Sequence, residues 1–363
     1  MFKYSESLVN YERFKSRTVF IGDVPLGSKY PIRIQSMTTT NTLDIESTAQ
    51  QSIKIIEAGS DYIRITAPSI KEALALKNIK KIIRNSGYNT PIIADIHFTP
   101  NAAIEAAQIV EKVRINPGNY ADKKKFLSFE YTDSEYNNEL DRIYNRFSPL
   151  VKICKKNGTA MRIGTNHGSL SDRIMNRFGD TPYGMVESAM EFLRICEDHN
   201  YYDVVVSMKS SNPIVMVQAY RLLVSEMLRI DMNYPIHLGV TEAGEGIEGR
   251  IKSSLGIGTL LEDGIGDTIR VSLTEDPEYE IPVAKNILSR YNKKNIDTGI
   301  SEPINQVLNP FEYEKRDTFK IKNIGSNNVP VVVADVSSLK NISIKILENL
   351  GYVYSESLDK WII

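Results

Sequence analysis

Cysteine is scarce in this chain, which has two cysteines, Cys154 and Cys196, among its 363 residues. Two cysteines cannot build the disulfide network that holds small secreted proteins together. Alone, they also cannot supply the three or four ligands that a zinc or iron–sulfur site needs. Both lie in segments with helical periodicity, where buried packing is favoured over reactivity. We therefore expect no metal cluster held by this chain alone.

An excess of charge, an aromatic stripe and a long apolar run are also missing. Lysine and arginine total 44 against 45 aspartates and glutamates, so the net charge of −1 excludes a basic coat for nucleic acid or a polybasic membrane anchor. The single tryptophan, Trp361, and the tyrosines do not interleave with a basic stripe. No window approaches the roughly 20 apolar residues of a membrane span, and the charged N-terminus lacks the apolar core of a signal peptide. We expect a cytoplasmic protein with no nucleic-acid or membrane partner.

Short apolar runs that end in polar residues recur along the chain, and such runs predict buried strands. They lie at residues 31–36, 61–65, 91–95, 112–116, 160–163, 203–207, 235–239 and 268–272. Segments of helical periodicity separate them, at residues 45–58, 70–85, 102–110, 136–157, 181–200, 212–229 and 250–262. Alternating strands and helices over about 270 residues match the count and size of a closed parallel barrel. We predict an α/β fold, a (β/α)8 TIM barrel.

The character of the chain changes after residue 290. Residues 1–30 are an N-terminal lead-in, residues 31–290 form the substrate-binding barrel, and the polar residues 291–310 predict a linker. The apolar run 329–335 and the helix-like segment after it predict the start of a second, incomplete α/β domain over residues 311–363. That segment has too few residues to close a core of its own.

Five cations stand where the predicted strands end, which is where barrel enzymes place their chemistry. These cations are Arg64, Arg114, Arg162, Lys209 and Arg270. Arginine suits bidentate phosphate contacts, and lysine adds a point charge to the same group. We expect a phosphate or diphosphate to balance these charges. For any single arginine, the alternative is an ion pair with a strand-end carboxylate that serves only the fold.

Neutral polar residues and glycines accompany the cations. The candidates for substrate contacts among the polar residues are Gln35, His97, Asn116, Asn166 and Ser272. Glycine-rich stretches at residues 162–169, 256–258 and 264–266 would let backbone amides approach an anion closely. Tight turns or close helix packing explain such glycines equally well.

Two carboxylates, Asp95 and Glu242, stand where a general acid or base could work. For each, the alternative is a carboxylate that orients an arginine. Asp95 and His97 also suggest a metal pair, but no third ligand is evident, so we predict no metal site.

Seven runs of residues carry a likeness to a known family: GDVPLGSKYPIRIQSMTTTNTLD, ADIHFTPNAA, VRINPGN, MRIGTNHGSLSDRI, SMKSSNP, HLGVTEAG and GDTIRVSLTEDP. Over about residues 13–290 the chain resembles the 4-hydroxy-3-methylbut-2-enyl diphosphate synthases of the methylerythritol phosphate pathway to isoprenoids. Residues 310–363 resemble the opening of the extra middle domain found in the longer, three-domain form of that family.

The resemblance implies an oxidoreductase that opens the ring of 2-C-methyl-D-erythritol 2,4-cyclodiphosphate and releases water. It also implies a 4Fe–4S cluster, with ferredoxin or flavodoxin as the electron donor. The residues implied to hold the diphosphate are Arg64, Arg114, Arg162, Lys209 and Arg270, with Asn166 and Ser272. Those implied to shape the pocket floor are Asp95, His97 and Asn116. Glu242 is implied to lie near the departing hydroxyl as a proton donor or hydrogen-bond partner.

The chain departs from the family pattern at the cluster. The family holds its cluster with three cysteines and a glutamate in a C-terminal domain, and neither Cys154 nor Cys196 matches one of these ligands. We therefore expect the cluster domain and its ligands to be absent from this chain. The chain would then supply the diphosphate-binding barrel and not turn the substrate over alone. A homodimer is left open.

Two other functions remain as alternatives. One is a non-catalytic remnant that retains the diphosphate pocket. The other is a pterin-binding transferase like dihydropteroate synthase, which also places Asp, Asn, Lys and Arg at strand ends and needs no iron.

Overall fold

The chain divides into two compact units, Met1–Glu312 and Tyr313–Ile363. The computed structural model describes residues 3–96, 98–120, 131–291, 301, 309–312, 315–331, 335, 337–339 and 341–362. One predicted site residue, His97, lies outside the described residues, as does most of the predicted linker at 291–310.

Eight parallel strands form one sheet in the first unit. They are β3 (Arg33–Met37), β4 (Tyr62–Thr66), β5 (Ile92–Asp95), β6 (Lys112–Ile115), β7 (Ala160–Asn166), β8 (Val204–Lys209), β9 (His237–Leu238) and β10 (Thr268–Ile269). Their order is β8-β7-β6-β5-β4-β3-β10-β9. An isolated parallel bridge between Val206 and Ile236 joins β8 to the residue before β9 and closes the ring. The predicted TIM barrel is confirmed, and each predicted strand overlaps one of these strands.

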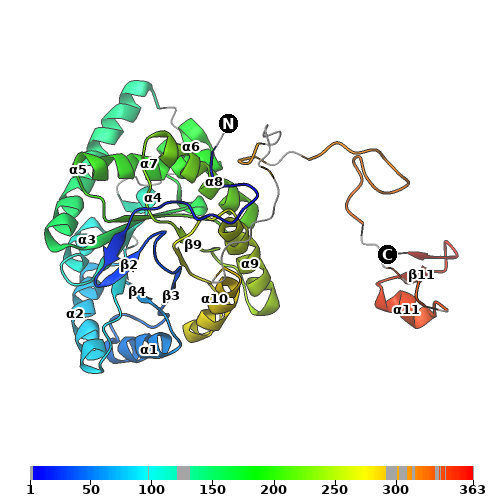
Figure 1. Cartoon of the computed structure of the whole chain (residues 1–363), viewed down its shortest axis with the longest axis horizontal. Coiled ribbons are helices and arrows are strands. Elements are labelled where there is room, and N and C mark those ends of the chain that lie inside the picture. Colours follow the sequence, from blue (N-terminus) through cyan, green and yellow to red (C-terminus); the bar gives the residue numbers. More distant parts are fainter. Residues whose placement is uncertain are drawn as a thin grey trace. The chain divides into compact units, whose positions relative to one another are not determined.

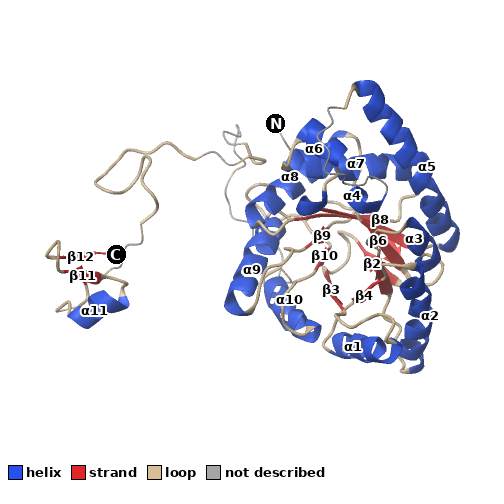
Figure 2. Cartoon of the chain, turned by 180° about the vertical axis from the view of Figure 1, so that it is seen from behind, coloured by secondary structure: helices blue, strands red, loops and turns tan. Residues whose placement is uncertain are grey.

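Helices cover the outside of the ring of strands (Figures 1 and 2). They are α1 (Ile45–Glu57), α2 (Ile70–Asn85), α3 (Pro100–Ala106), α5 (Asp133–Asn157), α7 (Pro182–Asp198), α8 (Pro213–Arg229), α9 (Gly246–Glu262) and α10 (Glu280–Ser289). Two short helices, α4 (Pro117–Tyr120) and α6 (Asp172–Phe178), lie in the connections that follow β6 and β7. Every helix that the sequence predicted is present. The bounds of α2 are as predicted because Ser69 and Glu72 form a capping box at its start. The sequence did not predict α4, α6 or α10. Of these, α4 and α6 have four and seven residues, which is too short to show a clear period.

The N-terminal lead-in folds into a β-hairpin that closes one end of the barrel. Its strands are β1 (Val19–Ile21) and β2 (Val24–Leu26), joined by a turn in which Gly22 has a φ of +56°. The hairpin packs on apolar residues at or near the starts of β4, β5, β7 and β8, namely Tyr62, Ile93, Ala160 and Val205. The N-terminal end of the barrel is thereby filled. The functional site must therefore lie at the opposite end, where the strands finish.

The second unit is small. It contains α11 (Ile344–Asn349) and an antiparallel pair, β11 (Val353–Ser355) and β12 (Lys360–Ile362). None of its described residues is buried, as expected for a segment too short to close a core. The strand predicted at 329–335 is not formed by the described residues of that stretch, and residues 332–334 lie outside the description. The assignment of this unit to a middle domain stays a prediction.

Candidate functional site

A cavity of about 420 Å³ opens at the C-terminal end of the barrel. Its lining is Arg64, Arg114, Asn116, Asn119, Asn166, His167, Gly168, Ser169, Lys209, Ser210, Ser211, Thr241 and Glu242. We call it the cationic cavity. It brings together six of the residues that the sequence singled out, from β4, β6, β7, β8 and the loops after β6 and β9. Asn119, His167–Ser169, Ser210, Ser211 and Thr241 also line the cavity, although they were not among the predicted site residues.

Asp95 joins two of the cavity's arginines. Its carboxylate accepts a hydrogen bond from Arg64, and its Oδ1 accepts one from Arg114 Nη1 at 3.1 Å. Arg114 Nη2 also donates to the backbone oxygen of Gly164 at 3.0 Å. Asp95 is fully buried, so these contacts have the geometry expected of a carboxylate that orients arginines. One carboxylate shared by two guanidinium groups neutralises at most one of them.

Arg162 is buried in the barrel beside Arg114 in the strand register, and it is not among the residues that line the cationic cavity. Its Nη1 donates to Nδ1 of the buried His237 at 2.8 Å, while its Nε and Nη2 have no partner among the described residues. Burial lowers the pKa of the Arg162 guanidinium, and the nearby Arg64 and Arg114 lower it further. Burial likewise lowers the pKa of His237, which favours the neutral ring that accepts this hydrogen bond.

Lys209 and Lys112 add two more buried cations to the barrel. Burial and then the neighbouring Arg162 lower the pKa of both ammonium groups. Lys112 Nζ lies 5.0 Å from the centre of the Tyr62 ring and has no hydrogen-bond partner among the described residues. Sequence reasoning missed Lys112. The signal was its place in β6 two residues before Arg114, which puts both side chains on the same face of the strand.

Two glycines make room for these cations. A Cβ at Gly164 would lie 2.7 Å from Arg114 Nε and 3.4 Å from Arg162 Nε. A Cβ at Gly239 would lie 2.8 Å from Lys209 Nζ. The other glycine-rich stretches serve the fold, because a Cβ at Gly256 would meet Val240 Cγ2 at 2.7 Å and Gly266 has a φ of +129°. For those stretches the packing and turn interpretations are correct.

Arg270 faces a different cavity from the one that contains Arg64 and Lys209. Its Nη2 donates to Glu280 Oε1 at 3.2 Å, and its Nε donates to Glu280 Oε2 at 3.3 Å. Arg270 therefore forms an ion pair with a carboxylate, which is the alternative to phosphate binding that the sequence left open for each arginine. The sequence did not point to Glu280, because a glutamate in the first turn of a helix is ordinarily a solvated residue.

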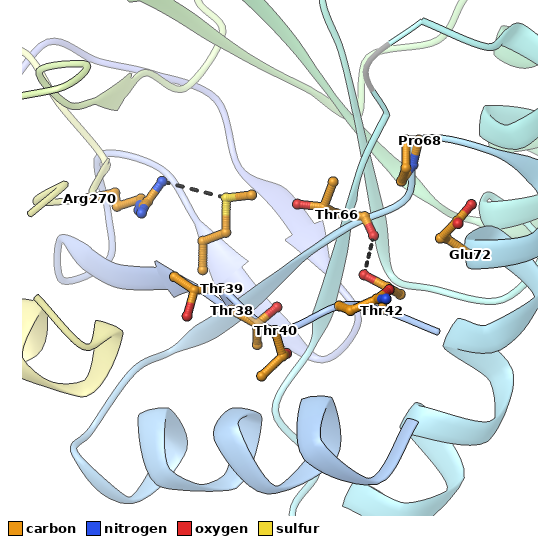
Figure 3. A pocket seen from close by; sticks show the side chains of 10 residues that line it. Thr38, Thr39, Thr40, Thr42, Thr66, Pro68, Glu72 and Arg270 are labelled. Carbon is orange, nitrogen blue, oxygen red and sulfur yellow. Dashed lines mark hydrogen bonds between the residues drawn. The ribbon is translucent and has the colours of Figure 1, made fainter. Parts of the chain in front are cut away.

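The cavity that Arg270 lines has a volume of about 540 Å³. The rest of its lining is Met37, Thr38, Thr39, Thr40, Asn41, Thr42, Thr66, Pro68 and Glu72. We call it the threonine cavity. Figure 3 shows Arg270 on one side of the threonines and Glu72 on the other. The sequence run that forms it contributed to the family likeness, but its threonines were not predicted as site residues.

Glu242 stands at the rim of the cationic cavity. It also lines a third cavity, of about 260 Å³, together with Ser272. Glu242 is exposed, and its backbone is in the left-handed region with a φ of +52°. A non-glycine residue in that region is uncommon, and strained backbone of this kind clusters at functional sites as well as in turns. Its carboxylate has no hydrogen-bond partner among the described residues.

Three remaining predicted residues occupy different places. Asn116 lies in the cationic cavity and donates from Nδ2 to Ser169 Oγ at 2.7 Å, while its Oδ1 has no partner among the described residues. Asn166 Oδ1 is likewise buried and unpartnered there. Gln35 lies inside the barrel instead of at its mouth, and its Nε2 donates to Thr268 Oγ1 at 2.8 Å. Gln35 therefore does not join the other candidates in a described cavity.

The described residues do not fit an iron–sulfur cluster. They include no group of three or more His, Cys, Asp or Glu side chains that could hold a metal ion. Cys154 in α5 and Cys196 in α7 are both buried. Burial raises the pKa of the Cys154 thiol to about 12, and it also raises the pKa of Cys196. A thiol held protonated in this way is a poor metal ligand.

None of the described helices is both long enough and apolar enough to cross a membrane.

Comparison with known proteins gives a family and a set of close relatives. The model described as the GcpE TIM-barrel domain matches residues 16–285. The flavodoxin-type 4-hydroxy-3-methylbut-2-en-1-yl diphosphate synthase of Leptospira interrogans is 52% identical over 362 residues, which are 98% of this chain and 54% of that protein. The Bacteroides fragilis protein of the same name is 55% identical over 90% of this chain and 53% of its own length. The ferredoxin-type, chloroplastic protein of Oryza sativa subsp. japonica is 56% identical over 78% of this chain and 38% of its own length. The chain spans about half the length of the first two relatives.

Proposed function

Because this chain belongs to the GcpE TIM-barrel domain family, we propose that it is the substrate-binding barrel of an oxidoreductase of isoprenoid biosynthesis. The substrate is 2-C-methyl-D-erythritol 2,4-cyclodiphosphate and the product is 4-hydroxy-3-methylbut-2-enyl diphosphate. The observation that carries the proposal is the cationic cavity, where Arg64, Arg114 and Lys209 line one space with Asp95 as the buried counter-charge. A diphosphate supplies the negative charge that this cavity needs. The family match favours this reaction over a pterin-binding transferase.

The barrel's part in this reaction is electrostatic. Overall, two electrons and one proton enter, the ring carbon–oxygen bond of the cyclic diphosphate breaks to leave a phosphate oxygen anion, and a hydroxyl group leaves with the proton as water. The phosphate that is released from the ring gains negative charge, and donors already in place stabilise such charge without reorganising. Arg64, Arg114 and Lys209 hold it, and the buried Arg162, which lies close to Arg64 and Arg114, adds to the positive field. The unpartnered Asn116 and Asn166 oxygens are acceptors for ligand hydroxyl groups.

Glu242 is the residue that we assign to the departing hydroxyl. It lies on the rim shared by the cationic cavity and the cavity of Ser272, so it can reach a ligand that fills either. When protonated, a carboxyl group can donate a proton to a leaving oxygen. Asp95 is tied to two arginines, so we assign it a positioning role instead of proton transfer.

The resemblance implies a 4Fe–4S cluster, and the names of the relatives give flavodoxin or ferredoxin as the electron donor. The described residues do not fit a cluster, so we assign them no electron-transfer step. We place the protein in the cytoplasm, where its two unpaired cysteines would stay reduced.

The test is a calorimetric titration of this chain with 2-C-methyl-D-erythritol 2,4-cyclodiphosphate. We expect saturable binding that Lys209→Gln weakens by about 1 to 3 kcal/mol, as for a lost hydrogen bond to a charged group. The matched control is Lys252→Gln, which removes an exposed lysine paired with Glu248 on α9 and should leave the affinity unchanged. A folded chain that fails to bind this ligand but binds a pterin diphosphate would reverse the assignment.

A further inference from the structure

The threonine cavity has a buried hydroxyl group that the fold does not use. Thr38 is 4% exposed, and its Oγ1 has no hydrogen-bond partner among the described residues. Its neighbours are engaged, since Thr42 Oγ1 donates to the Thr66 backbone oxygen at 2.6 Å and Thr40 Oγ1 donates to Thr48 Oγ1 at 2.9 Å (Figure 3). Those two hydroxyls hold the loop after β3 in place. A buried polar atom without a partner is costly, which points to a ligand that satisfies Thr38.

The charge on this cavity differs from that of its neighbour. Its one arginine, Arg270, is paired with Glu280, and Glu72 lies on the opposite side of the threonines. The net charge of this lining is therefore near zero or negative, which disfavours a diphosphate. The threonine methyl groups, Met37 and Pro68 add apolar surface. A lining of hydroxyl and methyl groups suits a neutral, hydroxylated and methylated carbon skeleton.

The two cavities share a boundary. The Thr38 backbone N–H donates to the Arg64 backbone oxygen at 3.0 Å, so the loop of the threonine cavity is fixed to the strand that carries a cation of the other. Along β4, Arg64 lines the cationic cavity and Thr66, on the same face two residues later, lines the threonine cavity. Arg270 is also close enough to lower the pKa of both Arg64 and Lys209. The linings of the two cavities are therefore adjacent along β4.

We propose that the threonine cavity binds the carbon skeleton of the molecule whose diphosphate occupies the cationic cavity, with Thr38 Oγ1 as its hydrogen-bond partner. This inference rests on the proposed function and assigns the substrate's two halves to two sets of residues. The cations recognise phosphate of any origin. The threonine cavity selects the hydroxylated, methyl-bearing part and so determines specificity.

The experiment compares two ligands on the full chain, 2-C-methyl-D-erythritol 2,4-cyclodiphosphate and inorganic pyrophosphate, by calorimetry. Thr38→Val keeps the shape of the side chain and removes the hydroxyl group. We expect it to weaken binding of the cyclic diphosphate by about 3- to 10-fold, the size of one neutral hydrogen bond, and to leave pyrophosphate binding unchanged. Because the hydroxyl is unpartnered in the free protein, the melting temperature should not fall. Lys209→Gln should weaken both ligands.

The matched control is Thr165→Val. Thr165 is also buried in the barrel wall with an unpartnered Oγ1, but it lines none of the three cavities described above, so neither ligand should be affected. Equal affinities of Thr38→Val and the wild type for the cyclic diphosphate would overturn the inference and leave the proposed function standing. An equal loss for both ligands would also overturn it, because Thr38 would then act on the phosphate or the fold. Binding of neither ligand by the folded wild type would instead refute the proposed function, and the inference with it.

Discussion

Arg270, directly after β10, and Glu280, at the start of α10, form a two-point ion pair at the mouth of the barrel. The same carboxylate accepts a hydrogen bond from Ser36 Oγ at 2.6 Å and one from the Leu273 backbone N–H at 3.1 Å. Glu280 thereby ties together β3, the end of β10 and the loop that carries Ser272. Those segments border the threonine cavity and the third cavity, which Glu242 and Ser272 line.

Glu280→Gln should destabilise the protein. The substitution keeps the side-chain size but removes the charge opposite Arg270 and one of the acceptor oxygens, in a position that is 2% exposed. We expect the free energy of unfolding to fall by about 3 to 5 kcal/mol, as when one partner of a buried ion pair is removed. Chemical denaturation measures it. Glu248→Gln, which removes an exposed carboxylate on α9, should change stability by less than about 0.5 kcal/mol. Equal stabilities of the two variants would show that Glu280 does not organise this end of the barrel.

Asp95→Asn separates a positioning role from proton transfer. The change takes the counter-charge from Arg64 and Arg114, so both guanidinium groups lose a charged acceptor. We expect weaker binding of the cyclic diphosphate, by about 10-fold or more, because misplaced arginines cannot meet the phosphate bidentately. A titration of wild type and variant with the same ligand measures the loss. An unchanged affinity would contradict the positioning role and return Asp95 to the candidates for an acid or base.

The affinity for the cyclic diphosphate should fall as pH rises. Burial and neighbouring cations lower the pKa of Lys209, so at alkaline pH part of the free protein carries a neutral amine there. A bound dianion favours the ammonium form and raises that pKa, so binding takes up a proton wherever the pH exceeds the pKa of the free protein. Each phosphorus of a cyclic diphosphate carries one acidic oxygen, so the ligand's own charge is constant over this range.

Calorimetry in pairs of buffers of different ionisation enthalpy, repeated across neutral and alkaline pH, measures this proton uptake. Lys209→Gln should remove both the proton uptake and the pH dependence. If both persist in that variant, Lys209 is not the titrating group and Lys112, whose pKa burial also lowers, becomes the candidate.

The sequence was sufficient to predict the barrel and the gathering of its cations, because parallel strands end at one side and Arg64, Arg114 and Lys209 each stand at or near a strand end. It was not sufficient to predict which group each of these side chains pairs with. Whether Arg270 faces phosphate or Glu280 depends on how the helix after β10 packs, which is a long-range feature that no local period encodes. The threonine run was visible, but only the fold shows that Thr38 is buried without a partner while Thr40 and Thr42 are engaged. The β1–β2 hairpin was missed because its strands have three residues each.

Gly164→Ala tests whether Arg114 and Arg162 can lie close together only because residue 164 has no Cβ. The new methyl group would lie 2.7 Å from Arg114 Nε, 3.1 Å from Ser207 Oγ and 3.4 Å from Arg162 Nε, so at least Arg114 must move. Since Arg114 lines the cationic cavity, we expect affinity for the cyclic diphosphate to fall by about 10-fold or more, the size of one charged hydrogen bond. The backbone at Gly164 is an ordinary strand conformation, so strain in φ does not contribute.

Gly258→Ala is the matched control for that substitution. Gly258 lies in α9, and the nearest atom to its new methyl group would be the Tyr291 hydroxyl oxygen at 3.9 Å. Alanine there should stabilise the helix by about 0.5 to 1 kcal/mol and leave the affinity unchanged. Undiminished affinity in Gly164→Ala would mean that Arg114 can move away from its present position and still hold the diphosphate. The contacts among Asp95, Arg114 and Gly164 would then serve the packing of the barrel and not the binding of the diphosphate, and the positioning role given to Asp95 would be wrong.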